Sequence, residues 1–289
     1  MDDLPTHKYL PFGKEAVRES KMSVEIDKNG DIWTIINDRS DARNAVDTDH
    51  AKALVSAFDA FENGPAKVAV FWGRGGNFCA GWDLKLAASL SNDIKREAYF
   101  DELAFPIGHG PTERGPLGPS RMELSKPIIG AVEGAAVAGG MELALWCDIR
   151  VMAETAYLGV YCRRWGITLM DGGAVRLPRL VGQGKALEIA MTGRKVEAEE
   201  CYRIGLAEKV VPHGEARAAA ESMAAEIARF PQEAVRADRR TIIETRGMSV
   251  RDAMKLEWSN GLEAIRREGT AGAGRFRDGA GRHGDFDKI

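Results

Sequence analysis

A glycine pair followed at once by an apolar segment with a single carboxylate is the feature of this chain best suited to chemistry. The pair is Gly139-Gly140, and the carboxylate is Glu142. Glycine has no Cβ, so a ligand can approach the backbone closely there. If the segment is a helix, its first N–H groups lack internal partners and can bind negative charge. Backbone donors facing a developing oxyanion, beside a carboxylate, suit a reaction next to a carbonyl group.

An ordinary helix start would give the same pattern, because a glutamate in the first turn complements the helix dipole. A second glycine-rich segment favours the chemical interpretation. Residues 73–85 follow the apolar run at 68–72, which predicts a buried strand, a turn and the start of a short helix. The turn lacks the lysine and hydroxyl residue that a P-loop requires, so it does not predict a phosphate cradle.

Both glycine-rich segments belong to a larger set that resembles the enoyl-CoA hydratase/isomerase (crotonase) family. The segments occur in the order and at the spacing of that family, and the likeness runs from about Val24 to the C-terminal helices. The two glycine-rich segments together make the resemblance specific. The matching segments are residues 43–47, 77–85, 126–134, 139–148, 171–178, 192–193 and 205–207.

The resemblance implies an α/β protein with the crotonase (ClpP-like) fold of repeated ββα units and a helical C-terminal region. It implies an N-terminal arm over residues 1–20, a core with the acyl-CoA site over 21–205, and a mainly helical trimerisation region over 206–289. The expected partners are an acyl-CoA thioester substrate and copies of the same chain, in a homotrimer or homohexamer. No cofactor is expected, because CoA is part of the substrate.

The hydrophobic pattern agrees with such a fold, because strands alternate with helices before an all-helical tail. Asn29-Gly30 predicts a hairpin turn, and the strand over 128–132 is expected to run into the glycine–glutamate helix. Residues 86–118, which include His109, predict a helix and a mobile loop that shape the acyl pocket. Strands are predicted over residues 23–27, 32–36, 68–72, 128–132, 148–152 and 209–211, and helices over 47–61, 184–191, 198–204, 214–229, 232–246 and 250–268.

Composition argues against several classes of function. The net charge is −3, with 40 Lys and Arg against 43 Asp and Glu, so no basic excess favours nucleic acid. No apolar run is long enough to span a membrane, and the acidic residues 1–5 do not resemble a signal peptide. Four cysteines without CxxC spacing predict reduced thiols in a cytoplasmic protein. The five histidines are scattered, which predicts no metal site.

The resemblance assigns an oxyanion hole to two backbone N–H groups, those of Trp82 and Gly139. Such donors would stabilise the enolate-like oxygen that forms when a thioester is attacked at Cβ or deprotonated nearby. The family usually carries a small residue where Trp82 stands, but only the N–H is needed. The indole either narrows the pocket or fills a gap beside Cys79.

The resemblance also aligns Glu142 with one of two glutamates that hold a water in the hydratases. The second glutamate is replaced by Cys162, whose thiol is a weak hydrogen-bond donor. Asp171 could take over its role, or it could be a turn residue before Gly172. Glu142 could also act alone, because one base suffices to move a double bond. A nucleophilic thiol is disfavoured, since no histidine is placed to activate it, and Cys162 is expected to be a small buried residue.

The leading interpretation is therefore an enoyl-CoA hydratase, which adds water reversibly across a 2,3 double bond. The alternatives are an isomerase or an acyl-CoA hydrolase on the same fold, or a CoA-ester binding protein with impaired catalysis. The resemblance places CoA along residues 43–45 and 80–85. Arg43 and Lys85 suit phosphate by charge, or are ordinary surface cations. The expected substrate-binding residues are Arg43, Ala45, Ala80, Asp83, Leu84, Lys85 and Cys162.

Overall fold

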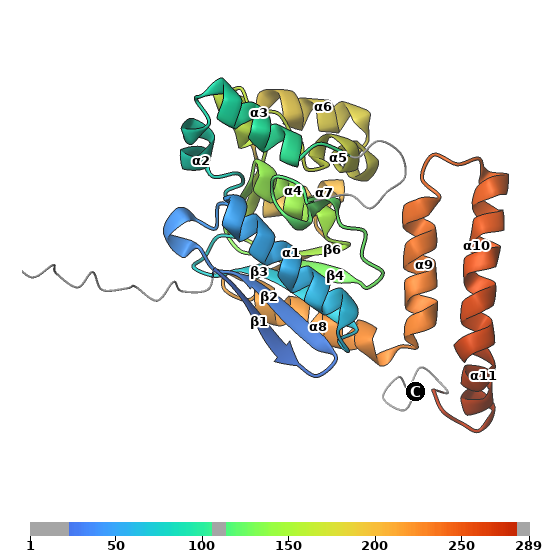
Figure 1. Ribbon diagram of the computed structural model, residues 1–289. Coiled ribbons are helices and arrows are strands. Elements are labelled where there is room, and N and C mark those ends of the chain that lie inside the picture. Colours follow the sequence, from blue (N-terminus) through green and yellow to red (C-terminus); the bar gives the residue numbers. More distant parts are fainter. Residues whose placement is uncertain (1–22, 106–113, 282–289) are drawn as a thin grey trace, which may run out of the picture.

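A six-stranded sheet forms the centre of the computed structural model, which describes residues 23–105 and 114–281 (Figure 1). The N-terminal arm predicted over residues 1–20 and the predicted loop residue His109 lie outside these ranges. β1 and β2 pair antiparallel around Gly30, whose φ of +55° suits glycine. The remaining neighbours pair parallel. The strand order is β1 (Val24–Asn29), β2 (Ile32–Asn37), β3 (Val68–Gly73), β4 (Ile128–Val132), β6 (Ile149–Ala153) and β9 (Lys209–Val211).

A second sheet of three short strands lies beside the first and was not predicted. It consists of β5 (Ala135–Val137), β7 (Tyr157–Gly159) and β8 (Lys195–Glu197). The expectation that β4 runs directly into the glycine–glutamate helix is therefore wrong. Gly134, at φ +52°, packs so tightly that an added Cβ would lie 2.1 Å from the Gly76 carbonyl oxygen. The chain turns there and forms β5 before the helix.

Two helices cover the large sheet. α1 (Thr48–Asn63) begins at the Asp47 cap, whose side chain accepts the N–H of His50, and buries Leu54, Phe58 and Phe61. α8 (Ala216–Arg229) packs on β3, β4 and β6. Its buried residues are the four alanines Ala216, Ala220, Ala224 and Ala228, which recur every fourth position and allow close approach to the strands.

The remaining helices form a layer over one end of the sheet and a projecting C-terminal pair (Figure 1). α9 and α10 pack against each other beyond the sheet. The predicted helix over 250–268 is divided, because a π-helical segment at Ile265–Gly269 separates α10 from α11. No helix within the two described ranges has the length and apolar character needed to cross a bilayer. The helices are α2 (Leu84–Ser89), α3 (Asp93–Glu102), α4 (Gly139–Trp146), α5 (Gly173–Val181), α6 (Gln183–Thr192), α7 (Ala198–Ile204), α9 (Gln232–Glu244), α10 (Val250–Ala264) and α11 (Thr270–Arg277).

Candidate active site

The fold brings the two glycine-rich segments side by side. Cys79 and Ala136 form a parallel bridge, and the Val137 N–H donates to the Cys79 carbonyl oxygen at 3.0 Å. An added Cβ on Gly81 would lie only 2.8 Å from the Gly139 nitrogen. Glycine is needed at this contact, both for the approach and for the φ of +92° at Gly81.

The backbone amides of Trp82 and Gly139 are left without backbone partners within residues 23–105 and 114–281. Trp82 lies in a parallel bridge with Val46. The two hydrogen bonds of this bridge join Val46 to the Gly81 carbonyl oxygen and to the Asp83 N–H, so neither involves the Trp82 N–H. Gly139 is the first residue of α4, so its N–H has no acceptor in the helix. Ala138, directly before it, has a φ of +53°, a strained value for a residue with a Cβ. Both amides belong to residues that line one cavity.

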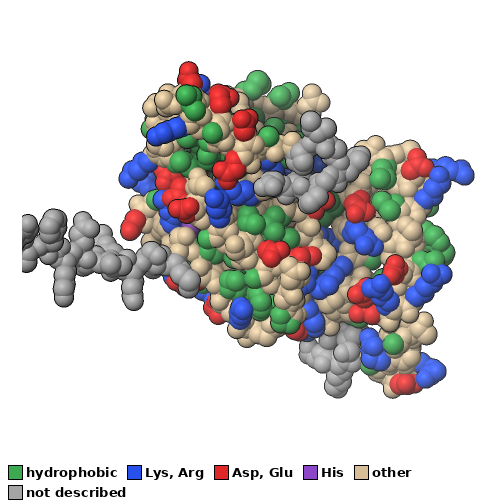
Figure 2. All heavy atoms as spheres, in the orientation of Figure 1, with side chains coloured by type: hydrophobic (Ala, Val, Ile, Leu, Met, Phe, Trp, Pro, Cys, Tyr) green, Lys and Arg blue, Asp and Glu red, His purple; other side chains and the backbone are tan. Residues whose placement is uncertain are grey.

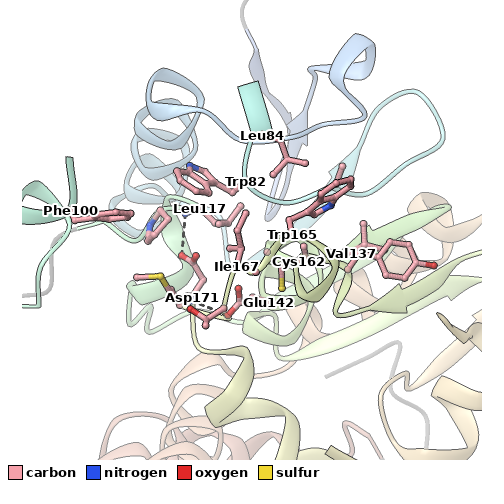
Figure 3. Close-up of a pocket in the computed structure, with 18 of the residues that line it drawn as sticks. Trp82, Leu84, Phe100, Leu117, Val137, Glu142, Cys162, Trp165, Ile167 and Asp171 are labelled. Atoms are coloured by element: carbon pink, nitrogen blue, oxygen red, sulfur yellow. Dashed lines mark hydrogen bonds between the residues drawn. The ribbon is translucent and has the colours of Figure 1, made fainter. Parts of the chain in front are cut away.

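Two buried carboxyl groups, those of Glu142 and Asp171, line the same cavity (Figure 3). Glu142 Oε1 accepts the N–H groups of Asp171 at 2.9 Å and Gly173 at 2.8 Å. Asp171 Oδ1 accepts the Leu117 N–H at 3.1 Å and the Ser120 hydroxyl. One oxygen of each carboxyl group is thus held by the protein, while Oε2 of Glu142 and Oδ2 of Asp171 take no part in these bonds.

The electrostatics of this pair favour proton transfer near neutral pH. Burial, together with the charge of Asp171, raises the pKa of Glu142 to about 7, against the lowering effect of its backbone hydrogen bonds. Burial also raises the pKa of Asp171, although the Ser120 hydroxyl and the Leu117 N–H oppose it. The Arg176 guanidinium supports this turn by donating to the Asp171 carbonyl oxygen at 2.9 Å. A carboxyl group with a pKa near 7 can both accept and release a proton under ordinary conditions.

The cavity has a volume of about 390 Å³, within the range of about 300–1,000 Å³ typical of small-molecule sites. Cys162 lines it and is 5% exposed. Burial and the nearby Glu142 raise the pKa of the Cys162 thiol, so the thiol stays protonated and is a poor nucleophile. The labelled lining residues in Figure 3 are Trp82, Leu84, Phe100, Leu117, Val137, Glu142, Cys162, Trp165, Ile167 and Asp171.

The residues predicted to bind CoA divide into two groups. Ala80 and Leu84 line the cavity, whereas Arg43, Ala45, Asp83 and Lys85 do not. Arg43 and Lys85 are exposed, and Ala45 is buried.

Asp83 has a structural role that its sequence position did not reveal. It caps α2 by accepting the Lys85 N–H at 2.8 Å, and it lies 3.0 Å from the Arg39 guanidinium. Burial opposes ionisation, but the Lys85 and Arg39 hydrogen bonds hold the pKa of Asp83 below its ordinary value. Arg39 also donates to the Ala45 carbonyl oxygen and pairs with Asp47 at 2.9 Å. This arginine therefore joins the two segments expected to bind CoA.

Sequence reasoning missed several residues that line the cavity or support it. Tyr99 stacks on Trp82, Leu117 and Ser120 hold Asp171, and Trp165 lies at the cavity with 65% of its surface exposed. Of these residues, only Trp165 could have been suspected from the sequence, because it lies three residues after Cys162. In the part of the chain that the structure describes, no group of three or more His, Cys, Asp or Glu side chains is arranged to hold a metal ion.

Comparison with known proteins extends the resemblance. The sequence matches the enoyl-CoA hydratase/isomerase family over residues 115–264. It is 34% identical over 258 residues to an enoyl-CoA hydratase of Mycobacterium tuberculosis, covering 86% of this chain and 91% of that protein. It is 33% identical over 246 residues to the carnitinyl-CoA dehydratase of Proteus mirabilis, covering 84% and 88%.

The fold can be compared directly with solved structures. A crystal structure of an enoyl-CoA hydratase from Mycobacterium tuberculosis H37Rv superposes with a TM-score of 0.79 at 32% identity. The match covers 89% of this chain and 96% of that chain. The expected α/β crotonase fold with a helical C-terminal region is confirmed by this likeness. The fold contains a second sheet that was not expected.

Proposed function

Because this chain belongs to the enoyl-CoA hydratase/isomerase (crotonase) family, we propose that it is an enoyl-CoA hydratase. It would add water reversibly across the 2,3 double bond of an enoyl-CoA thioester. The observation that carries the proposal is that one cavity is lined by two buried carboxyl groups, Glu142 and Asp171, and by two residues whose amides have no backbone partner among the described residues. A pair can hold one water molecule, whereas a single base cannot both activate and orient it.

In this mechanism the thioester carbonyl oxygen accepts hydrogen bonds from the N–H groups of Trp82 and Gly139. Oε2 of Glu142 and Oδ2 of Asp171 hold the water. Glu142 takes a proton from the water while the water oxygen bonds to Cβ. At the same time the electron pair of the double bond shifts through Cα, so that negative charge develops on the carbonyl oxygen. The two amides stabilise this enolate. Asp171, protonated at the start, gives a proton to Cα, and the carbonyl forms again.

Isomerisation is the second candidate, and the departure at Cys162 favours it. If Asp171 only supports the turn, Glu142 alone can move a proton between two carbons. The two reactions are separated by following the conjugated absorbance of the thioester. A hydratase removes that absorbance from crotonyl-CoA, whereas an isomerase leaves crotonyl-CoA unchanged and produces the absorbance from a 3-enoyl-CoA.

Substitution of Cys162 tests which group completes the pair. Cys162→Ala is expected to leave the hydration rate of crotonyl-CoA within a few-fold, because the protonated thiol only fills space. Cys162→Glu is expected to lower the rate, because another carboxyl group beside Glu142 and Asp171 would repel them and raise a pKa further. A rise in rate with Cys162→Glu would instead mean that Asp171 does not serve as the second carboxylate.

The C-terminal helices support a proposal of self-association. Val250, Met254 and Trp258 recur at every fourth position of α10 and are 78%, 60% and 69% exposed. Figure 2 shows hydrophobic side chains among the charged ones at the surface of these helices. Such a stripe is more apolar surface than a free helix usually exposes. We propose that it packs against other copies of the chain in a trimer or hexamer.

Sedimentation velocity at micromolar concentration tests this assembly. The unmodified chain is expected to sediment as a trimer or hexamer, and Trp258→Glu as a smaller species, because a charge would have to be buried in the interface. Ile94→Glu on α3, at a position that is 81% exposed, serves as the matched control and should leave the assembly unchanged. A stable monomer of the unmodified chain would contradict the proposal.

A further inference from the structure

One side of the cavity is formed by three aromatic side chains, Trp82, Tyr99 and Phe100, here called the aromatic wall. The Trp82 and Tyr99 rings are stacked, with centroids 6.0 Å apart and an interplanar angle of 23°. The Phe100 ring meets Tyr99 edge to face at 5.7 Å and 68°. Aromatic side chains from two separate segments, the end of the 73–83 turn and α3, thus form one continuous surface.

The indole N–H of Trp82 already has a hydrogen-bond partner within this wall. The Trp82 indole N–H donates to the Tyr99 hydroxyl oxygen at 3.2 Å, and Tyr99 is only 9% exposed. A ligand can therefore contact the wall through apolar ring surface, but the indole N–H is not free to donate a hydrogen bond to it. The hydrogen bond also fixes the Trp82 and Tyr99 rings relative to each other.

Much of the remaining cavity lining is apolar as well. Leu117, Ile167 and Met170 line the same cavity. Among its lining residues, ionisable carboxyl groups occur at Glu142 and Asp171, where the reaction is proposed to take place. The cavity thus combines a fixed aromatic wall with aliphatic side chains.

From this shape we infer that the site selects CoA thioesters whose acyl group carries a planar ring, in preference to unbranched chains with the same number of carbons. A ring can stack against the Trp82 indole, which Tyr99 holds in place, and offset stacking is favourable beyond the burial of area alone. A ring also has fewer rotatable bonds to immobilise than a chain of equal carbon count. The inference rests on the proposed function only in taking a CoA thioester as the ligand.

Binding of two saturated thioesters to the whole chain tests the selection without any reaction. The 5-phenylpentanoyl and undecanoyl thioesters both have eleven acyl carbons, and neither has a double bond to hydrate. Isothermal titration calorimetry is expected to give a Kd about fivefold lower, or better, for 5-phenylpentanoyl-CoA. A pocket that recognises only apolar surface would bind undecanoyl-CoA more tightly, because an alkyl chain buries more apolar area than a phenyl ring. A ratio near one, or a preference for undecanoyl-CoA, would overturn the inference.

Substitution of Tyr99 locates the selection on the aromatic wall. Tyr99→Leu should reduce the Kd ratio to within about twofold, because the stacked ring is lost, whereas Tyr99→Phe keeps the ring and should keep most of the ratio. Tyr202→Leu on α7, at a position 60% exposed and outside the cavity lining, is the matched control and should leave the ratio unchanged. A full ratio in Tyr99→Leu would disprove the role of the wall. If this variant does not fold, the Kd ratio measured for the unmodified chain still tests whether the site prefers ring-bearing acyl groups.

The hydration rates of the corresponding 2-enoyl thioesters separate the two proposals. Ring-selective binding without any hydration would contradict the proposed hydratase activity and support the selection of ring-bearing acyl groups. Hydration of both thioesters without ring-selective binding would support the hydratase activity and contradict the selection of ring-bearing acyl groups.

Discussion

Replacing Glu142 with glutamine is expected to lower the rate of crotonyl-CoA hydration by at least about a hundredfold, the usual contribution of a general base. Glutamine keeps the shape of the side chain, and its carbonyl oxygen can still accept the N–H groups of Asp171 and Gly173 that now bind Oε1. It cannot accept a proton from water. The loss should therefore appear in kcat, while the Kd of a saturated acyl-CoA hardly changes.

The raised pKa of Glu142 gives this prediction a pH dependence. The carboxyl group must be ionised to act as a base, so kcat/KM of the unmodified enzyme should fall as pH decreases below about 7. A glutamate with the ordinary pKa of 4.5 would instead keep most of its activity down to about pH 5.

The raised pKa of Glu142 also makes the stability of the fold depend on pH, but stability decreases as pH rises, whereas activity increases. The folded state binds the Glu142 proton more tightly than the unfolded state, so this group destabilises the fold progressively as pH rises from 4.5 through about 7. Glu142→Gln removes that ionisation. Its Tm should exceed that of the unmodified chain at about pH 8, and the difference should shrink toward about pH 5. Unchanged turnover, or a Tm lowered at every pH, would show that Glu142 only supports the start of α4.

The second large effect is expected at Asp171. Asp171→Asn should reduce hydration about as strongly as Glu142→Gln, by roughly a hundredfold, because both groups are needed to order one water molecule. The asparagine carbonyl oxygen can still accept the Leu117 N–H and the Ser120 hydroxyl, so the loop that now binds Oδ1 should keep its conformation. Steady-state rates on crotonyl-CoA, with the Kd of a saturated acyl-CoA as control, provide the measurement.

Two other results would assign the chemistry differently. Loss of hydration with retained double-bond isomerisation in Asp171→Asn would show that Glu142 suffices for proton transfer between carbons. Full hydration in Asp171→Asn, combined with loss in Cys162→Ala, would make the thiol the reacting group, in spite of the burial that raises its pKa.

The fold was most predictable where local signals were strong. The helix over 198–204 and the strand over 209–211 have the predicted bounds. Gly205, at φ +82°, ends that helix in a conformation that glycine adopts readily. β5, β7 and β8 were missed because strands of three residues are too short to show a periodic pattern, and they exist only through pairing with one another.

The candidate site divides in a similar way. Glycine spacing and resemblance pointed to Trp82, Gly139, Glu142, Cys162 and Asp171, all of which line the cavity. Their catalytic roles remain predictions. The partners of these residues could not be found from sequence. Tyr99 and Ser120 come from a segment without a recognisable motif, and each reaches the site through contacts that only the tertiary structure creates.

The hydrogen bond from the Asp171 amide to Glu142 bears on how such a site can evolve. This N–H belongs to the backbone, so any residue except proline at position 171 would supply it. A change of side chain there would replace the proposed second acid and leave this support of Glu142 in place. The position can therefore change its side chain while the backbone N–H that holds the proposed base, Glu142, is kept. A scaffold with this property can acquire new reactions one residue at a time, which suits a fold that hosts many chemistries.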